Sequence, residues 1–149
     1  MNLKKILIIF IFSFAFSEIW EGYTIFTPYA PGSASTSTYL LNTDGETINT
    51  WEHERNPASM PYLRPDSSIV YPYVVDTPSM SAGGVGGGIQ IISWNGGILW
   101  DYELSNTDLQ HHHDIQPLPN GNILAIAWER KTALEAFSLG REVINNPIN

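Results

Sequence analysis

The chain has 149 residues, with no cysteine, 12 glycines and 10 prolines, which limits it to one small, turn-rich globular unit and excludes a multidomain assembly. Hydrophobic residues make up 43% and aromatic residues 12% of the sequence. The chain therefore has enough apolar side chains to form a hydrophobic core. Because the frequent turn residues favour short strands, we predict the all-β class. Fifteen acidic residues against seven basic ones give a net charge of −8, which argues against a nucleic-acid partner because phosphate binding needs a clustered basic face.

Residues 1–17 have the composition of a signal peptide. Lys4 and Lys5 precede an uncharged apolar run over residues 6–16, which is shorter than the roughly 20 residues that a membrane span needs. Small side chains at Ala15 and Ser17 predict cleavage after Ser17, and the alternative is an uncleaved anchor. We expect an exported protein, periplasmic or secreted, that has no membrane attachment after cleavage and is held by packing alone, since no disulfide can form.

An internal repeat organises the rest of the chain. Residues 39–51 and 89–100 both read as an apolar strand, an Asx-Gly turn and a second strand that ends in tryptophan, and their turns lie 51 residues apart. Residues 65–70 and 119–124 form a second similar pair, offset by 54. A period near 50 residues that holds about four short strands is typical of a β-propeller blade.

We therefore expect two blades, near residues 38–75 and 87–128. Residues 19–27 are an additional strand candidate, and a helix is expected near 129–140 because its apolar residues have helical spacing and Gly140 is a natural stop. Known propellers typically need four to eight blades to close, so we expect residues 18–149 to be the N-terminal part of a longer propeller. The predicted strands cover residues 38–43, 47–53, 60–64, 68–74, 88–93, 97–103, 112–118 and 122–128.

The glycine run over residues 83–88 resembles a phosphate-binding loop only superficially. Such a loop ends in Gly-Lys-Ser/Thr and opens a helix, whereas an evident strand follows Gly88. We interpret the run as a flexible loop between blades where backbones pass closely, with a backbone amide nest at a ligand site as the alternative. No cofactor is expected.

Three of the four histidines lie together in His111-His112-His113-Asp114. On a regular strand His111 and His113 would share one face and His112 and Asp114 the other, so the run does not favour a metal site unless it forms a loop. Sliding the sequence by 54 places the His112-His113-Asp114 segment on residues 58–60, which read Ala-Ser-Met. A residue needed only for blade geometry should recur, so this segment points to function, with a structural histidine contact as the alternative.

Several roles are open to these side chains. A neutral imidazole at His112 can act as a nucleophile or a proton carrier, and a charged one can hold an anion, while Asp114 could orient the ring. Arg130 is a second candidate for binding an anion, with a solvated surface position as the alternative. Four tryptophans at strand ends and turn edges are interpreted as packing between blades rather than as a substrate platform: Trp51, Trp94, Trp100 and Trp128.

The sequence resembles the bacterial arylsulfotransferases over residues 22 to about 141. The most specific match is residues 112–115, His-His-Asp-Ile, followed by Leu-Pro-Asn-Gly-Asn-Ile-Leu over 118–124 and Ala-Trp-Glu over 127–129. Further matching segments are residues 22–26, 38–41, 44–45, 50–51, 82–84, 94–96, 100–102 and 131–136. The resemblance implies a six-bladed propeller that transfers a sulfuryl group from an aryl sulfate to a phenol through a histidine intermediate.

The resemblance also implies site residues. It assigns His112 as the active-site histidine of its blade and Asp114 as its partner, with His113 and Arg130 as weaker candidates, and it implies no metal. Further histidines and an arginine are expected beyond residue 149, so we expect the chain alone not to catalyse transfer. The alternatives are a non-catalytic exported propeller that serves as a binding module and a metal site built on the histidine run.

Overall fold

A computed structural model describes residues 21–28, 36–80 and 83–144. Within these ranges it contains nine strands and one short helix, which confirms the all-β class. The predicted signal peptide lies outside the described residues. The elements are β1 (Thr24–Phe26), β2 (Thr36–Leu41), β3 (Thr47–His53), β4 (Tyr62–Leu63), β5 (Ile69–Val74), β6 (Gly87–Ile92), β7 (Ile98–Glu103), β8 (Leu109–Pro117), β9 (Ile123–Glu129) and α1 (Ala133–Ser138).

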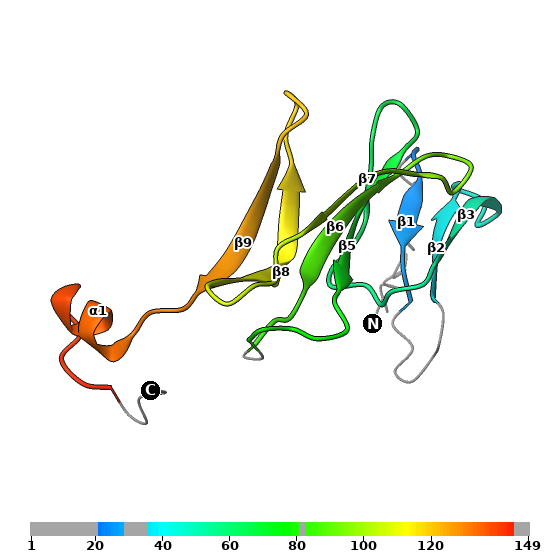
Figure 1. Ribbon diagram of the computed structural model, residues 1–149. Coiled ribbons are helices and arrows are strands. Elements are labelled where there is room, and N and C mark those ends of the chain that lie inside the picture. Colours follow the sequence, from blue (N-terminus) through cyan, green and yellow to red (C-terminus); the bar gives the residue numbers. More distant parts are fainter. Residues whose placement is uncertain (1–20, 29–35, 81–82, 145–149) are drawn as a thin grey trace, which may run out of the picture.

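The strands form three antiparallel sheets, β1-β2-β3, β4-β5-β6-β7 and β8-β9, which lie side by side in Figure 1. The predicted unit 38–75 therefore takes its strands from two sheets, and so does the predicted unit 87–128. Turn residues locate a hairpin, but they do not say which hairpins join in one sheet. Here β5 and β6, separated by the glycine-containing connection, pair over six residues, so the structural unit begins two strands later than the sequence suggested.

The repeat itself is present in the pairing of the strands. Leu40 pairs with Asn49 and Leu41 with Thr47, with a bulge between them, and 51 residues later Ile91 pairs with Trp100 and Ile92 with Ile98 around the same bulge. The β4–β5 and β8–β9 hairpins likewise share one register at an offset of 54. The short β1 pairs with residues 39–41 of β2, which correspond to residues 90–92 of β6 that pair with the start of β5. The three sheets are thus copies of one structural pattern.

All four hairpins close with the same turn. In each, the fourth turn residue has a positive φ and its N–H donates to the carbonyl of the first, as Gly45 does to Asn42 at 3.1 Å. Gly96 and Gly121 occupy this position in two of the other hairpins, and Ser67, with φ 65°, occupies it in the β4–β5 hairpin. Asp44 and Asn95 do not have positive φ. The turns are therefore of the type with a single left-handed residue, not the two-residue type with two.

The larger core cluster lies between the first and second sheets. Trp51 is fully buried, and its indole N–H donates to the Ser93 carbonyl at 2.9 Å, while the Trp94 ring meets it edge-on with centroids 5.6 Å apart. Burial of such a side chain contributes about 1.5–3 kcal/mol or more. The packing interpretation holds for Trp51, whereas Trp94, Trp100 and Trp128 each remain more than a third exposed. The cluster consists of Leu40, Trp51, Ile69, Tyr71, Tyr73, Val75 and Ile92.

The helix α1 is shorter than predicted, because Thr132 caps its start and it begins only at Ala133, after β9 ends at Glu129. Thr132 and Glu135 form a capping box at its start. At its end the Gly140 N–H donates to the Phe137 carbonyl and the Arg141 N–H to the Ala136 carbonyl, with Gly140 at φ 95°, which is a Schellman ending. None of its residues is buried. No helix in the described ranges has the length and hydropathy to cross a membrane.

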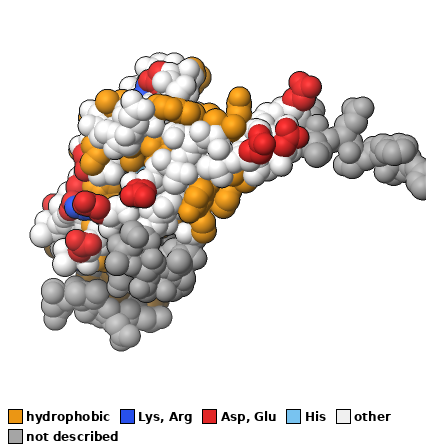
Figure 2. Space-filling view, turned by 90° about the vertical axis from the view of Figure 1, so that its right-hand side faces the viewer, with side chains coloured by type: hydrophobic (Ala, Val, Ile, Leu, Met, Phe, Trp, Pro, Cys, Tyr) orange, Lys and Arg blue, Asp and Glu red, His pale blue; other side chains and the backbone are white. Residues whose placement is uncertain are grey.

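The surface carries more acidic than basic side chains, as the net charge of −8 predicts. On the face shown in Figure 2, acidic side chains are scattered and outnumber the basic ones. The ion pairs among the described residues join neighbours at the surface, such as Arg64 with Asp66 at 3.5 Å, and exposed pairs of this kind contribute little to stability. Packing and backbone pairing, not charge, hold the three sheets together.

We predict that Ser67→Gly stabilises the chain by about 0.5–1 kcal/mol, because glycine adopts the left-handed conformation without the clash that a Cβ causes. The matched variant Ser67→Ala keeps the Cβ and should give no gain. Urea unfolding followed by circular dichroism measures both. Equal stability of the glycine and alanine variants would contradict the strain argument.

A second prediction concerns His53, which is buried, stacked on Tyr71 with ring centroids 3.7 Å apart, and hydrogen-bonded to Thr38 at 2.7 Å. Burial lowers its pKa from 6.5 to about 4. Between these values the unfolded chain binds a proton that the native chain does not, so stability falls as the pH drops from 6.5 to 4, by up to about 3 kcal/mol. His53→Gln, which keeps a hydrogen-bonding group, should make that part of the pH profile shallower, and the slope that remains comes from the buried His111, whose pKa burial also lowers. An unchanged slope in His53→Gln would rule out His53 as a source of the pH dependence.

Candidate functional site

The histidine run lies in a bulge of β8. His111 pairs with Ala127 and Ile115 pairs with Ala125 on β9, so three residues of β8 stand opposite the single residue Ile126. Bulges of this kind break the alternation of side chains and aim them in new directions. The run is therefore neither a regular strand nor a free loop, so the division of its side chains between two faces that a regular strand would give does not apply.

The first repeat unit contains the same irregularity. Pro57 forms a bridge with Tyr73, which is the His111–Ala127 pair moved back by 54, and Tyr62 pairs with Val70 as Gln116 pairs with Leu124. This confirms the alignment of His112-His113-Asp114 with residues 58–60. The bulge belongs to the scaffold, whereas the two imidazoles and the carboxylate occur in one unit alone.

His111 is a structural residue. It is fully buried, and Nδ1 accepts a hydrogen bond from the Gly87 N–H at 3.2 Å while Nε2 lies 3.4 Å from the Asp114 carbonyl oxygen. Burial lowers its pKa, and the hydrogen bond to the Asp114 backbone opposes that shift. An imidazole in this position stays neutral near pH 7 and holds the bulge against the glycine-rich loop.

His112 is enclosed by the glycine-rich loop and Trp128. The Gly84 N–H donates to Nε2 of His112 at 3.4 Å, and the Trp128 ring lies 4.9 Å from the His112 ring and donates its indole N–H to the Gly84 carbonyl at 3.3 Å. A Cβ on Gly84 would come within 2.6 Å of the His112 ring and 2.9 Å of the His113 ring. The close backbone approach expected for the glycine run is thus made against the histidines.

Nδ1 of His112 faces Nδ1 of His113 in a short hydrogen bond, and their rings meet edge-on with centroids 4.2 Å apart. Since Nε2 of His112 accepts from Gly84, the proton of a neutral His112 lies on Nδ1 and is donated to His113. His113 then carries its own proton on Nε2. Among the described residues no group is hydrogen-bonded to that N–H, so His113 presents a free donor at the end of a chain that begins at the Gly84 amide.

Asp114 does not have the partner that the sequence suggested. Its Oδ1 accepts from the Ser59 hydroxyl at 3.2 Å, and in the described residues no hydrogen bond joins its carboxylate to a histidine ring. Ser59 occupies the position in the first unit that His113 occupies in the second, so the two bulges adjoin each other. The carboxylate connects the sheets and does not orient the ring of His112.

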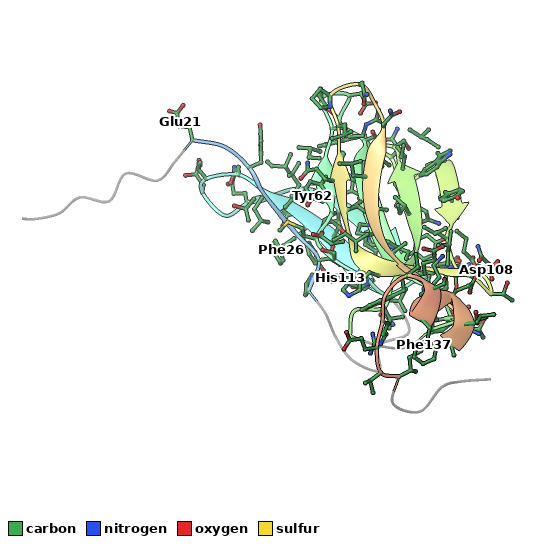
Figure 3. The ribbon with its side chains drawn as sticks, turned by 90° about the vertical axis from the view of Figure 1, so that its left-hand side faces the viewer. Glu21, Phe26, Tyr62, Asp108, His113 and Phe137 are labelled. Carbon is green, nitrogen blue, oxygen red and sulfur yellow. The ribbon has the colours of Figure 1, made fainter. Side chains whose placement is uncertain are left out.

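A groove of about 580 Å³ adjoins this contact. Ser59 lines it together with Phe26, Met60 and other apolar side chains, and Figure 3 shows Phe26 and His113 toward the same end of the sheets. A wall of this composition suits an apolar or aromatic group. The complete lining consists of Ile25, Phe26, Thr27, Pro57, Ala58, Ser59, Met60, Val74 and Val85.

Arg130 stands apart from the histidine pair. Its Nη2 donates to the Ser79 carbonyl at 3.0 Å, and its backbone N–H donates to the Asp108 carbonyl at 2.8 Å. No hydrogen bond links it to the cluster within the described part of the chain. The side chain is exposed, as the surface interpretation requires, and it secures the loop that leads toward Gly84.

A metal centre lacks the necessary ligands among the described residues, where no group of three His, Asp or Glu side chains is placed to hold an ion. His111 faces the Gly87 amide, and the Nδ1 atoms of the other two histidines face each other. Two ring nitrogens that face each other cannot both coordinate the same metal ion.

The sequence did not identify Gly84, Trp128 and Ser59 as members of this site. The glycine run was visible, but its contact with the histidines depends on a loop folding back across 28 residues. Ser59 could have been found by extending the repeat alignment, because it is the counterpart of His113. In comparisons with known proteins, no family model, curated protein or solved structure matches this chain.

The tautomers can be tested by nitrogen-15 NMR of the imidazoles at a pH where they are neutral. We predict the Nδ1–H form for His112 and the Nε2–H form for His111 and His113. Gly84→Ala should displace both rings and abolish the His112 preference, whereas Gly97→Ala, where a Cβ would meet only the Ser93 hydroxyl at 3.2 Å, should leave it. An Nε2–H form of His112 in the wild-type chain would contradict the hydrogen-bond chain.

Proposed function

We propose that the histidine pair binds the anionic sulfate group of an aryl sulfate, and that the chain is an arylsulfotransferase-like protein. The observation that carries this proposal is the free Nε2–H of His113, held by His112 and Gly84 in a bulge that the first repeat unit shares without the histidines. A scaffold feature that carries imidazoles in one unit only is explained by a ligand. The resemblance of residues 112–124 to the arylsulfotransferases points to the same class of ligand.

We also propose that the three sheets are blades of a β-propeller. Their common registers, bulges and turns support one repeated unit of four antiparallel strands, which the β4–β7 sheet shows in full. Sheets that repeat side by side with short connections are the basis of propellers. In such an arrangement the bulges of successive units lie near one end, where a ligand can contact several of them.

The chemistry of sulfate esters suits the cluster. A sulfuryl group carries its charge on three oxygens, and N–H donors that do not need to reorganise bind such a group well. His113 supplies one donor of this kind, and the groove beside Ser59 offers Phe26 and Met60 to the aryl ring. The polar and apolar parts of an aryl sulfate thus have counterparts on neighbouring elements.

Transfer through a histidine would form an N–S bond as the bond between sulfur and the aryl oxygen breaks and the phenolate leaves; an acceptor phenol would then take the sulfuryl group from nitrogen. The attacking nitrogen needs a free lone pair, but Nε2 of His113 carries a proton. Shifting that proton to Nδ1 would reverse the donor order and remove the Gly84 hydrogen bond. Arg130 is held by Ser79 and does not neutralise charge here. We therefore expect the chain to bind an aryl sulfate without turning it over.

A second candidate, an exported propeller that only binds its ligand, is favoured by one observation. Both ring nitrogens of His112 have protein partners, Gly84 and His113, so this histidine is placed to position another group and not to attack a substrate. A binding module requires no more than the free donor and the groove. The two candidates differ in whether sulfuryl transfer follows binding.

The test is titration of the isotope-labelled chain with 4-nitrophenyl sulfate, followed by NMR. We predict saturable shifts at residues 112–114 and at the groove, with affinity at least about tenfold weaker in His113→Ala, since loss of a hydrogen bond to a charged group costs about 1.5–3 kcal/mol. 4-Nitrophenol, which lacks the sulfate, should bind weakly to both. Lys131→Gln, which removes an exposed charge outside the cluster, is the control.

Three outcomes decide among the candidates. Binding that needs His113 and the sulfate, without release of 4-nitrophenol, supports anion recognition by this chain. Transfer of the sulfuryl group to added phenol would overturn the expectation that the chain alone does not turn over and would exclude the pure binding module. Equal affinity for the wild type and His113→Ala would contradict the site.

A further inference from the structure

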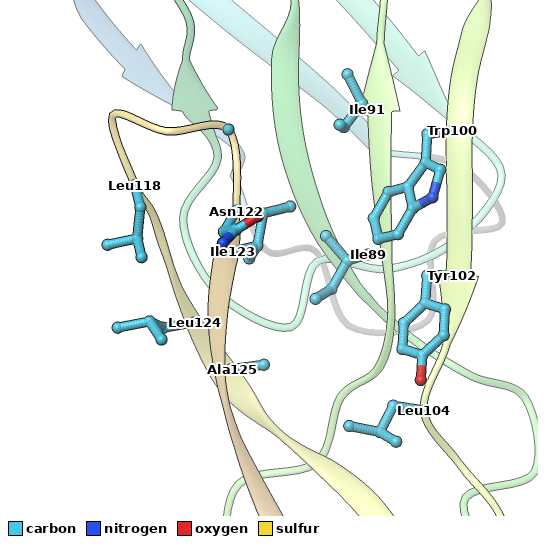
Figure 4. Close-up of a pocket in the computed structure, with 11 residues that line it drawn as sticks. Ile89, Ile91, Trp100, Tyr102, Leu104, Leu118, Asn122, Ile123, Leu124 and Ala125 are labelled. Carbon is cyan, nitrogen blue, oxygen red and sulfur yellow. The ribbon is translucent and has the colours of Figure 1, made fainter.

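The outer edge of β9 and the face next to it form an unfilled surface. A groove of about 680 Å³ lies between the β6–β7 strands and the β8–β9 hairpin, and Figure 4 shows Trp100 and Tyr102 on one side of it and Ile123 and Leu124 on the other. Leu124 and Ile126 are 59% and 57% exposed, and Trp100 and Tyr102 are 41% and 49% exposed. In the described residues β9 pairs on one side only, with β8.

The molecule shows what covers such a surface, because the equivalent one is filled between the first two sheets. By the offset of 51, Tyr102 corresponds to Trp51 and Trp100 to Asn49. Trp51 is buried by the β6–β7 hairpin and donates to the Ser93 carbonyl in its turn, and Asn49 donates to the Trp94 carbonyl at 2.9 Å. That hairpin is held in place because β6 pairs with β5, whose counterpart in the third sheet is β9.

We propose that the surface binds the β2–β3 hairpin of a second copy of this chain, with β2 of the partner copy pairing antiparallel to β9. The hairpin has the register, bulge and turn of β6–β7, so it is the segment of the chain that fits this position. The register follows from the β5–β6 pairing: Ile123 would lie opposite Leu41 of the partner copy, Ala125 opposite Tyr39 and Ala127 opposite Ser37.

Among the residues that the structure describes, the edge of β2 that this pairing needs is paired with β1. β1 contributes three residue pairs, and its three residues are exposed or half-buried. β5 gives β6 six pairs in the same register, and β9 is long enough to offer β2 the same number. Exchange of β1 for β9 therefore gains backbone hydrogen bonds and buries the apolar groove, which is the direction that strand addition to a free edge favours.

Neither strand carries a device that blocks association. Natural sheet edges are protected by lysine, proline or bulges that twist the edge away, but residues 123–128 contain no charge and no proline, and neither does β2. The need to displace β1 from β2 and the net charge of −8 both oppose association, and salt screens the charge. The contact is head-to-tail, since each copy offers a hairpin at one end and β9 at the other, so repetition closes a ring or extends a chain.

Disulfide trapping tests the register, because the chain has no cysteine of its own. Ala127→Cys protein is mixed with Ser37→Cys protein under mild oxidation and the cross-linked heterodimer is quantified. Opposite residues of an antiparallel pair bring their Cα atoms to about 4.5–5.5 Å, within the range that a disulfide bridges. The matched control mixes Ala125→Cys with Ser37→Cys, which lies two residues, about 7 Å, out of register. We expect at least tenfold more heterodimer from the first mixture, and equal yields would overturn the proposal.

Analytical ultracentrifugation of the full wild-type chain, without introduced cysteines, at several concentrations tests association itself. We expect species larger than a monomer, increasing with salt, and their loss in Leu124→Lys, which places a charge in the groove. Leu134→Lys, the same change on the exposed helix α1, should associate as the wild type does. Circular dichroism checks that both variants keep the fold. A monomer at all concentrations, or association that survives Leu124→Lys in a folded protein, would overturn the proposal.

Discussion

The pairing of β8 with β9 passes over three residues of β8, and the direction of every side chain in the histidine cluster depends on this bulge. With regular pairing, His112 and His113 would point to opposite faces of the sheet. In the bulge their rings meet instead, and His111 is turned toward the core, where the Gly87 amide holds it. The buried histidine and the half-buried pair therefore form one arrangement: the first anchors the bulge, and the other two are displayed by it.

The glycine-rich loop is the second half of this arrangement. Its glycines are needed at positions where a Cβ would collide with neighbouring side chains: at Gly84 with His112 and His113, at Gly86 with His111, and at Gly88 with Tyr73. The loop approaches the histidines with its backbone, and in doing so it supplies the amide that fixes the tautomer of His112. Sequence features 28 residues apart are thus parts of one site.

The local elements could be predicted from the sequence, while their grouping could not. Asx-Gly turns and apolar runs located β2, β3, β6 and β7 to within about two residues, because a turn and its flanking strands are encoded by adjacent residues. The phase of the repeat depends on pairing across the long β5–β6 connection, which no local signal specifies. In the site, the repeat showed that residues 112–114 differ between the two units, but it gave no indication of the bulge, so it predicted neither the contact between the His112 and His113 rings nor the hydrogen bond from Ser59 to Asp114.

Two repeat units share one backbone pattern but carry different side chains in the bulge. Residues in the bulge make no cross-strand pair, so residues 58–60 and 112–114 can differ without changing the register of either hairpin. Paired and buried positions have no such freedom, because a change there alters the core that joins the sheets. The histidines therefore occupy the positions of the unit where a change of side chain disturbs the fold least. Because paired positions are constrained and bulge positions are not, the β4–β5 and β8–β9 hairpins keep the same pairing of residues, while the histidine pair occurs in only one of them.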